Sequence, residues 1–335
     1  MLKEALAASA VVQSQCADSA RVEALASVLA AKPCHVALTV ARGSSDHAAS
    51  YFASLAMSRI GLPVASLPMS IATLQAAPLR VAGELAVAFS QSGRSPDLVD
   101  TMTALRDAGA LTVSAVNAPV SPLADACEWQ LPLLAGPERS VAATKSYIAM
   151  LSISAQLVAY WQRDPVLIDA LRALPDTLRD AAVIDWSLAV DTLREVERMI
   201  VIGRGLGLAV AQEAALKLKE TSGIQAEAFS SAEVRHGPME LIDRGYPLLV
   251  FAPRGPEQAG LIRLAADMRS RGARVLLAAP EDVEDAQLRL ATSRHPALDP
   301  IAVIQTFYIM AAELAAARGR DPDAPRHLNK ITETH

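Results

Sequence analysis

Two short hydroxyl-rich segments follow apolar runs in the first half of the sequence. HVALTVA (35–41) leads into RGSSDH, and ELAVAFS (84–90) leads into QSGRSPD. Ligands of parallel sheets lie at the carboxyl ends of strands, where backbone N–H groups and helix dipoles favour an anion. Hydroxyl and amide side chains add neutral donors at the same place. The candidate ligands are Ser44, Ser45, Ser90, Gln91, Ser92 and Ser95.

Each serine also has a simpler interpretation. Ser95-Pro96-Asp97 is typical of a helix start, with a capping hydroxyl, proline in the first turn and an acid on the dipole. A single serine is more often a cap than a ligand. Five serines and a glutamine at two strand ends favour an anion site, although neither a P-loop nor a complete G-x-G-x-x-G is present.

The second half of the sequence places charges on a largely apolar helical segment. Glu213, Lys217 and Glu220 are spaced i, i+4 and i+7, so they share one stripe. A solvated ion-pair stripe is the alternative, but the apolar positions around them over 206–218 favour burial and a functional role. A buried carboxylate beside a lysine can serve as a base. His236, in EVRHGP, is a second candidate proton carrier because histidine titrates near neutral pH.

Strand-length apolar runs alternate with helical patterns along the whole chain, which predicts an α/β fold with parallel sheets covered on both faces. The further strands are expected at 110–116, 128–133, 198–203, 224–229, 247–253 and 273–279. The segments VARGSSDHAASYFASLA and IGRGLGLAVAQEAALKL, which begin at Val40 and Ile202, indicate an internal repeat. We therefore expect two copies of one doubly wound domain, over 20–160 and 190–320. Where the first copy has FSQSGRSPD, the second has FAPRGPEQ.

Composition limits the classes of partner. The net charge of −5 argues against a nucleic-acid partner, and the three cysteines have no metal-ligand spacing. The longest uncharged stretch, 146–162, is short for a bilayer span and predicts a buried helix. The first residues make a poor signal peptide. A cytoplasmic protein with no metal, cofactor, nucleic-acid or membrane partner is expected.

Several motifs together resemble the sugar isomerase (SIS) domain family. They are SQSGRSPD, SVAATKS, ALKLKETSGIQAEAF, EVRHGPMELI and DAPRHLNKIT, in order along nearly all of the chain. The resemblance is strongest to the isomerase half of glutamine–fructose-6-phosphate aminotransferase and to amino-sugar-phosphate deaminases. It implies two tandem flavodoxin-like SIS domains and a tail, 321–335, that closes the active site.

The resemblance also implies roles for individual residues. The substrate would be an open-chain hexose 6-phosphate or amino-sugar 6-phosphate, held by the serines and Gln91. Glu220 would move a proton between C1 and C2. Lys330 would form a Schiff base, with Lys217 nearby. His236 would help to open the sugar ring and would come from the neighbouring subunit, so a homodimer with shared active sites is expected.

Two departures from the family pattern affect the expected reaction. The aminotransferase carries a glutaminase domain, for which this sequence has no room, so ammonia release from glucosamine 6-phosphate is favoured over synthesis. Arg94 replaces an acid of SGET and Ala143 a serine of ASTK, which leaves the sugar open. The alternatives are galactosamine 6-phosphate deamination, fructosamine 6-phosphate deglycation, plain isomerisation, or a non-catalytic phosphosugar sensor.

Overall fold

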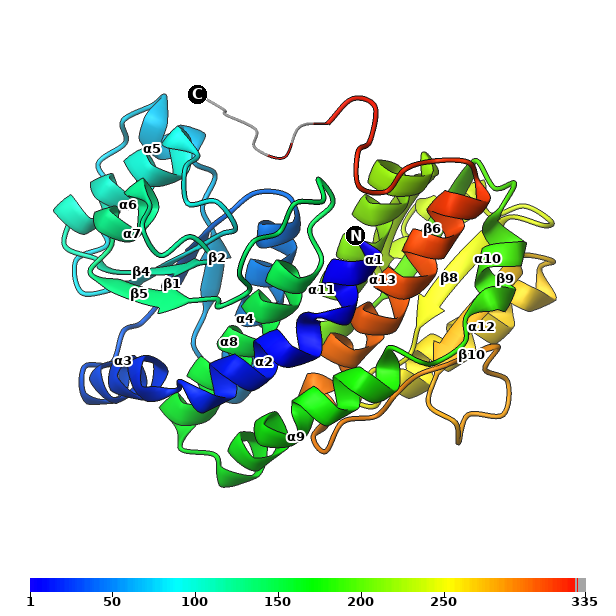
Figure 1. Cartoon of the computed structure of the whole chain (residues 1–335), viewed down its shortest axis with the longest axis horizontal. Coiled ribbons are helices and arrows are strands. Elements are labelled where there is room, and N and C mark those ends of the chain that lie inside the picture. Colours follow the sequence, from blue (N-terminus) through cyan, green and yellow to red (C-terminus); the bar gives the residue numbers. More distant parts are fainter. Residues whose placement is uncertain (329, 331–335) are drawn as a thin grey trace. The chain divides into compact units, whose positions relative to one another are not determined.

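The computed structural model describes residues 1–328 and Lys330, and it forms two compact units (Figure 1). The N-terminal unit contains Ala10–Glu138, Lys145–Arg172 and Lys330. The C-terminal unit contains Met1–Ser9, Arg139–Thr144 and Ala173–Leu328. The first residues of the chain and the 139–144 loop thus belong to the C-terminal unit, although they lie before the second predicted domain in sequence.

The N-terminal unit is built on a five-stranded parallel sheet with strand order β2-β1-β3-β4-β5. This is the order 2-1-3-4-5 of a doubly wound, flavodoxin-like sheet. The strands are β1 (Ala37–Val40), β2 (Val64–Ser66), β3 (Leu85–Ser90), β4 (Leu111–Val116) and β5 (Trp129–Pro132). All but β2 were predicted, and β2 is an edge strand of only three residues, Val-Ala-Ser.

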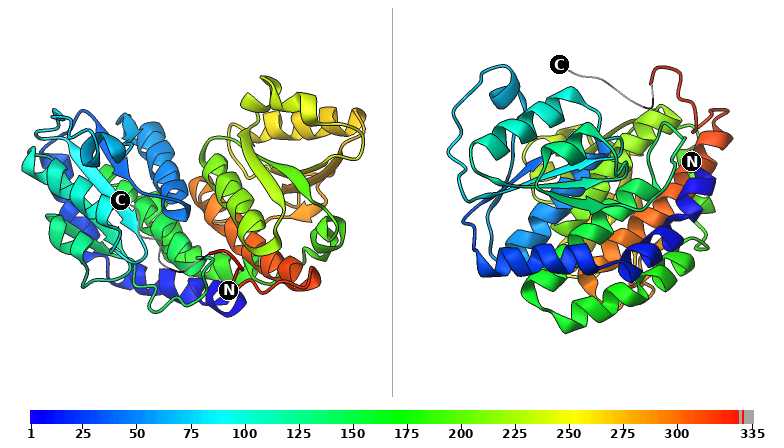
Figure 2. Two further views of the ribbon diagram at one scale, coloured as in Figure 1. Left: turned by 90° about the horizontal axis from the view of Figure 1, so that it is seen from above. Right: turned by 60° about the vertical axis from the view of Figure 1, so that its left-hand side comes forward.

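Helices cover both faces of this sheet (Figures 1 and 2). Successive side chains of a strand point to opposite faces, and because both faces are apolar, both are covered. On one face, Phe89 of β3 packs against Phe52 of α4 (Ser44–Arg59), with ring centroids 6.0 Å apart. On the other face, Ala86 and Ala88 pack with apolar residues of α6. The helices of this unit are α2 (Ala8–Ala17), α3 (Ala20–Ala31), α4, α5 (Ser70–Thr73), α6 (Pro96–Asp107), α7 (Pro122–Ala126) and α8 (Lys145–Gln162).

The C-terminal unit repeats the same topology, with strand order β10-β9-β8-β6-β7. Its strands are β6 (Arg198–Gly203), β7 (Gln225–Ser230), β8 (Pro247–Phe251), β9 (Arg274–Ala279) and β10 (Leu288–Arg289). Gly43 and Gly205, which precede the first helix of each repeat, both have φ 55° and ψ −132°. The internal repeat predicted from sequence is therefore present down to a shared glycine turn with positive φ. The predicted class of two tandem doubly wound α/β domains is confirmed.

The remaining elements complete the C-terminal unit and the connection between the repeats. They are α1 (Leu2–Leu6), α9 (Pro165–Ala181), α10 (Ser187–Leu193), α11 (Leu206–Lys217), η1 (Leu218–Ser222), η2 (Glu233–Arg235), η3 (Pro238–Leu241), α12 (Gln258–Ser270), η4 (Pro296–Leu298) and α13 (Asp299–Ala317). Within the described residues, one segment, Pro296–Ala317, has the length and hydropathy of a membrane span, but 78% of its apolar 18-residue window is buried. It is placed as a core helix, and α8 is likewise almost entirely buried, as predicted.

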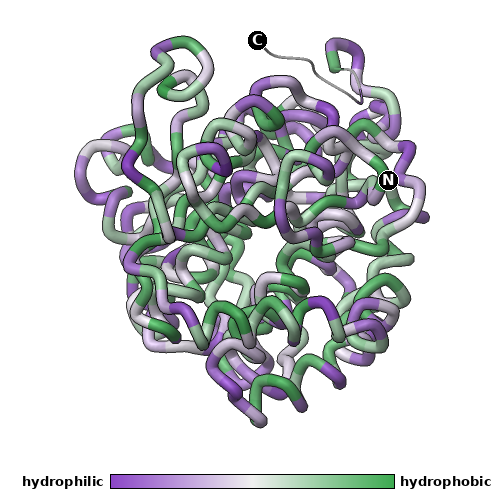
Figure 3. Tube along the Cα trace, turned by 90° about the vertical axis from the view of Figure 1, so that its left-hand side faces the viewer, coloured by the Kyte–Doolittle hydropathy of each residue, from purple (hydrophilic) through white to green (hydrophobic). Residues whose placement is uncertain are grey.

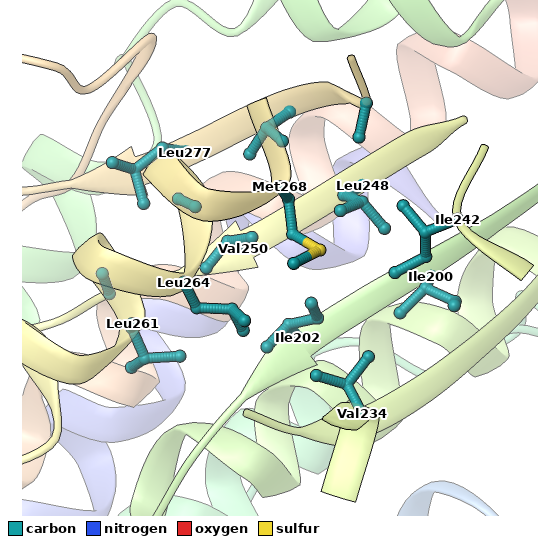
Figure 4. Packing of buried hydrophobic residues seen from close by; sticks show 14 of the residues in the cluster. Ile200, Ile202, Val234, Ile242, Leu248, Val250, Leu261, Leu264, Met268 and Leu277 are labelled. Atoms are coloured by element: carbon teal, nitrogen blue, oxygen red, sulfur yellow. The ribbon is translucent and has the colours of Figure 1, made fainter. Parts of the chain in front are cut away.

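A large apolar cluster lies between the second sheet and α12 (Figure 4). Leu264 and Met268 of α12 pack on Ile202 and Val250 of neighbouring strands. The backbone trace alternates between hydrophobic and hydrophilic residues along its helices, as one-sided packing requires (Figure 3). Burial of one helix face on the sheet therefore holds this repeat together.

We predict that Leu264→Ala lowers the free energy of unfolding by about 2–5 kcal/mol, because it removes a buried side chain and leaves a cavity. Leu264 is 1% exposed. Urea unfolding measures the change. Leu241→Ala is the control, since Leu241 is 56% exposed and should stay within about 0.5 kcal/mol. Equal losses for the two variants would contradict this packing.

Candidate functional site

The two hydroxyl-rich segments come together at the point where strand order reverses in the N-terminal unit. Strands β1 and β3 are paired neighbours, with Val40 opposite Ala88, and their carboxyl ends lead into α4 and α6. The two helices pack on opposite faces of the sheet, so their first turns diverge above the shared edge. In doubly wound sheets this reversal is where ligands bind.

The structure brings the predicted ligands together at this edge. Ser44 and Ser45 form the first turn of α4 and are half-buried. Ser95 is the N-cap residue of α6, but its side chain makes no capping hydrogen bond. Within residues 1–328 and 330, no hydrogen bond is formed by the side chains of Ser45, Gln91 and Ser95. The cap interpretation of Ser95 thus holds for the backbone only, and its hydroxyl remains available to a ligand.

The loop after β3 is a tight turn stabilised by its own serines. The Gly93 N–H donates to Ser90 Oγ at 2.9 Å, and the Arg94 N–H to Ser92 Oγ at 3.4 Å. Gly93 has φ 64°, and a Cβ there would clash with Ser121 and Val116. Only glycine fits this turn, which keeps the loop close to the end of β3.

Arg42 supplies a fixed positive charge beside these serines, and sequence analysis did not single it out. Its Nε and a terminal nitrogen lie 2.7 and 2.6 Å from Oδ2 of Asp97, whose side chain is only 2% exposed. The ion pair joins the loop after β1 to the first turn of α6. More than half of the arginine side chain stays exposed, so it can also attract an anion. The Arg-Gly pair that occurs in both repeats, in RGSS and RGLG, was the sequence signal that could have pointed to Arg42.

The equivalent point of the C-terminal unit is filled by the protein itself. Glu257 follows Gly255 by two residues, as Ser95 follows Gly93, and it is the N-cap residue of α12. A Cβ at Gly205 would clash with the Glu257 carboxylate, whereas one at Gly43 would have no neighbour within 4 Å. An internal carboxylate thus occupies the helix N-terminus that is open in the first repeat.

The predicted charged stripe of the C-terminal unit forms a buried network. Lys217 Nζ lies 2.5 Å from Glu220 Oε2 and 3.4 Å from Glu213 Oε1. The Tyr308 hydroxyl of α13 donates to the same Glu213 oxygen at 2.9 Å. Glu213 and Lys217 are at most 1% exposed, but 19% of the Glu220 side chain is exposed. Burial is confirmed, and of the two carboxylates Glu220 is the one that a substrate can reach. Tyr308 was missed, since only the tertiary fold brings α13 beside α11.

A π-turn sets the direction of Glu220. Helix α11 ends at Lys217 and continues as η1, which closes on Gly223 in the left-handed region at φ 63°. Arg318 supports this turn by donating from Nε to the Ser222 carbonyl at 2.8 Å. Single π-turns often occur at functional sites because they redirect side chains off the regular helical stripe.

The two carboxylates keep Lys217 charged. Burial by itself would lower the pKa of Lys217, but the charges and hydrogen bonds of Glu213 and Glu220 outweigh it and raise the pKa above its ordinary value. An amine that stays protonated is a poor nucleophile. Lys217 therefore acts as a cation that holds Glu220.

His236 and Lys330 lie in different units. His236 follows η2 and is exposed, and in the described part of the chain no hydrogen bond is formed by its ring. Lys330, of the N-terminal unit, has Nζ 3.5 Å from Glu138 Oε2, and Glu138 was not singled out from the sequence. The hydroxyl edge and the Lys217–Glu220 network are thus each assembled within one unit.

The thiols contribute no comparable reactivity. Burial raises the pKa of Cys16 to about 11 and of Cys127 to about 12, so little thiolate forms near neutral pH. Among residues 1–328 and 330, no group of three or more histidine, cysteine or acidic side chains is arranged to hold a metal ion.

We predict that Lys217→Met costs about 3–5 kcal/mol of unfolding free energy, because it leaves the buried Glu213 and the half-buried Glu220 without their cation. The folded pKa of Lys217 lies above the unfolded value of about 10.4. Its stabilisation is therefore fully present below that pH and is lost as the pH rises through the folded pKa. Urea unfolding of both proteins between pH 7 and 11 should show a difference in unfolding free energy that is constant near neutral pH and shrinks at the alkaline end of the range. A difference that stays constant throughout would contradict the ion-pair account.

Comparisons with known proteins agree with this architecture. The chain is 35% identical over 319 residues to "Glutamine--fructose-6-phosphate aminotransferase [isomerizing]" of Aeropyrum pernix; the match covers 88% of the chain but spans only half of that relative's length. A crystal structure from Silicibacter pomeroyi DSS-3, provisionally called a phosphosugar isomerase, is 39% identical, with a TM-score of 0.91 over 96% of this chain and 99% of that one. Glucosamine-6-phosphate deaminase of Thermotoga maritima has a TM-score of 0.79 over 99% of both chains at 22% identity, which shows the fold alone.

The family model agrees in extent with the two repeats. It matches residues 32–160 and 192–315, so it covers both sheets and the helices that carry the candidate residues. With two doubly wound repeats and a match over most of its length, this chain belongs to the SIS domain family.

Proposed function

We propose that the protein is a phosphosugar isomerase that acts as a glucosamine-6-phosphate deaminase. Glucosamine 6-phosphate and water would give fructose 6-phosphate and ammonia. The observation that carries the proposal is the presence, in one chain, of an open hydroxyl-lined strand edge and a buried lysine–glutamate pair. A sensor of phosphosugars would need only the first of these.

The hydroxyl edge suits the phosphate of the substrate. Ser44, Ser45, Ser90, Gln91, Ser92 and Ser95 would donate to its oxygens, and the exposed guanidinium of Arg42 would add charge. The sugar-phosphate specificity finds support in the Aeropyrum pernix relative, whose name contains fructose 6-phosphate. Because this chain spans half of that relative, the substrate remains part of the proposal.

Glu220 would carry the proton in the isomerisation. In the open-chain amino sugar, it would remove the C2 proton and return it to C1, which moves the double bond and leaves an imine at C2. A carboxylate within reach of both carbons is suited to this shuttle. Among the network residues, Glu220 is suited to carry this proton because it is partly exposed and lies beside the Lys217 cation.

Lys330 would then release ammonia. Its amine would attack C2 of the imine and expel ammonia, which gives a lysine Schiff base; water would hydrolyse this to fructose 6-phosphate and regenerate the amine. This step needs a neutral amine, and the raised pKa of Lys217 disfavours that residue for the role. Together, these reaction steps consume only the amino sugar and water.

The direct test follows ammonia and fructose 6-phosphate together, with glucosamine, galactosamine and fructosamine 6-phosphates as substrates. We predict equal amounts of both products from glucosamine 6-phosphate, and a loss of at least about 100-fold in kcat for Glu220→Gln. Glu227→Gln, an exposed acid on β7, is the matched control and should keep full activity. Turnover that survives in Glu220→Gln would remove the proposed base, and activity on another sugar only would reassign the substrate.

We further propose a homodimer in which His236 acts in the neighbouring subunit's site. The exposed position of His236 is consistent with this role. Mixing His236→Ala with Glu220→Gln protein, each inactive alone, should restore up to about a quarter of wild-type activity, because subunit exchange creates sites with both residues intact. Activity assays after mixing, with wild-type protein mixed as a control, measure it. No recovery despite proven subunit exchange would contradict the shared site.

A further inference from the structure

Glu138 is a buried carboxylate outside both predicted clusters. It lies in the loop between β5 and α8, and its side chain is 0% exposed. Ser146, in the first turn of α8, donates to it from its backbone N–H at 3.2 Å and from its hydroxyl at 2.6 Å. These bonds hold the carboxylate at the positive end of an 18-residue helix.

The same carboxylate faces the C-terminal lysine. Glu138 Oε2 is both the acceptor of the Ser146 hydroxyl bond and the atom 3.5 Å from Lys330 Nζ. Lys330 is 23% exposed, so the ion pair is partly shielded from water. The same loop also contacts the tail from Ser140 and Val141, which follow Glu138 closely in sequence. Ser140 Oγ donates to the Pro322 carbonyl at 3.3 Å, and the Val141 N–H donates to the Asp323 carbonyl at 3.1 Å.

A segment near a chain end frays unless contacts tie it down. The hydrogen bonds to 322 and 323 fix the tail upstream, but Lys330 lies seven residues further on. Its ammonium lies 3.5 Å from a carboxylate oxygen of the buried Glu138. Fixing a long lysine side chain in one position costs conformational entropy. Glu138, which is held by two hydrogen bonds from Ser146, offsets this cost by pairing with the ammonium.

We propose that Glu138 is the positioning residue for Lys330, and this inference rests on the proposed function. With Glu138 in place, the amine is held in one position, and the carboxylate takes up the ammonium proton when the sugar is bound, so that the neutral amine attacks the sugar carbon. Phosphate binding by the serines is independent of it. Misplacement of a reacting group by about 1 Å can cost about 100-fold in rate. Loss of Glu138 should therefore lower kcat and leave KM nearly unchanged.

The experiment compares Glu138→Gln with wild type. Glutamine retains an oxygen that accepts from Ser146, so the loop should fold, but it lacks the charge that holds Lys330. Glu128→Gln removes an exposed acid of the same unit and is the matched control. We expect a 10- to 100-fold lower kcat for Glu138→Gln, a KM within about threefold of wild type, and no change for the control.

A second readout does not depend on sugar chemistry. Trypsin cleaves after lysine, and cutting after Lys330 releases the peptide 331–335, which mass spectrometry detects. We expect several-fold faster release from Glu138→Gln than from wild type or Glu128→Gln. If Glu138→Gln fails to fold, Glu138→Asp keeps the charge on a shorter side chain and should give intermediate values in both assays.

The outcomes separate the two proposals. Unchanged release and unchanged kcat in Glu138→Gln would overturn the positioning role, while an active wild type would leave the deaminase intact. Faster release with unchanged kcat would overturn it as well, because the contact would then be structural only. An inactive wild type on every phosphosugar would overturn the function, and faster release would then support only the ion pair.

Discussion

The reversal of strand order at the centre of each sheet is the constraint on which the candidate chemistry depends. Strands β1 and β3 are neighbours, but the helices that follow them go to opposite faces. Their first turns place two positive helix ends at one edge, which requires a polar or anionic group there, from a side chain or a ligand. The two repeats meet this requirement differently, with Glu257 in the second and hydroxyl side chains in the first.

The buried charges impose a second requirement. Two carboxylates and one ammonium inside the C-terminal unit are tolerated only because each has a partner, Tyr308 included. Such a network contributes little net stability compared with an apolar core, but it holds Glu220 in one position. The π-turn and Arg318 support the same position from the backbone side. Both features are understandable if the site's task is proton transfer.

Much of this architecture could be predicted from the sequence, since long apolar strands and glycine turns are local signals. Strand β3 was expected at 84–90 and occupies Leu85–Ser90. Strands β2 and β10 were missed because they are edge strands of three and two residues, whose pairing depends on the neighbouring strand. The candidate serines and the Glu–Lys stripe could be singled out because they lie within short local motifs.

The partners of these residues could not be predicted, since they come from distant parts of the chain. Arg42 and Asp97 are 55 residues apart, Tyr308 and Glu213 are 95 apart, and Lys330 and Glu138 are 192 apart. Only the folded topology brings such pairs within contact distance. The filling of the second edge by Glu257 also required a three-dimensional comparison of Gly43 with Gly205.

The number of fructose 6-phosphate molecules bound per chain tests the central claim most directly, that one strand edge is an open phosphosugar site and the other is filled. Arg254 precedes Gly255 after β8 as Ser92 precedes Gly93 after β3, so it is the position of the second edge that matches Ser92. Isothermal titration calorimetry on wild type, Ser92→Ala and Arg254→Gln measures the number bound. The account predicts one molecule per chain, weaker binding in Ser92→Ala, and unchanged binding in Arg254→Gln. Two molecules per chain, or binding that depends on Arg254 and not on Ser92, would contradict it.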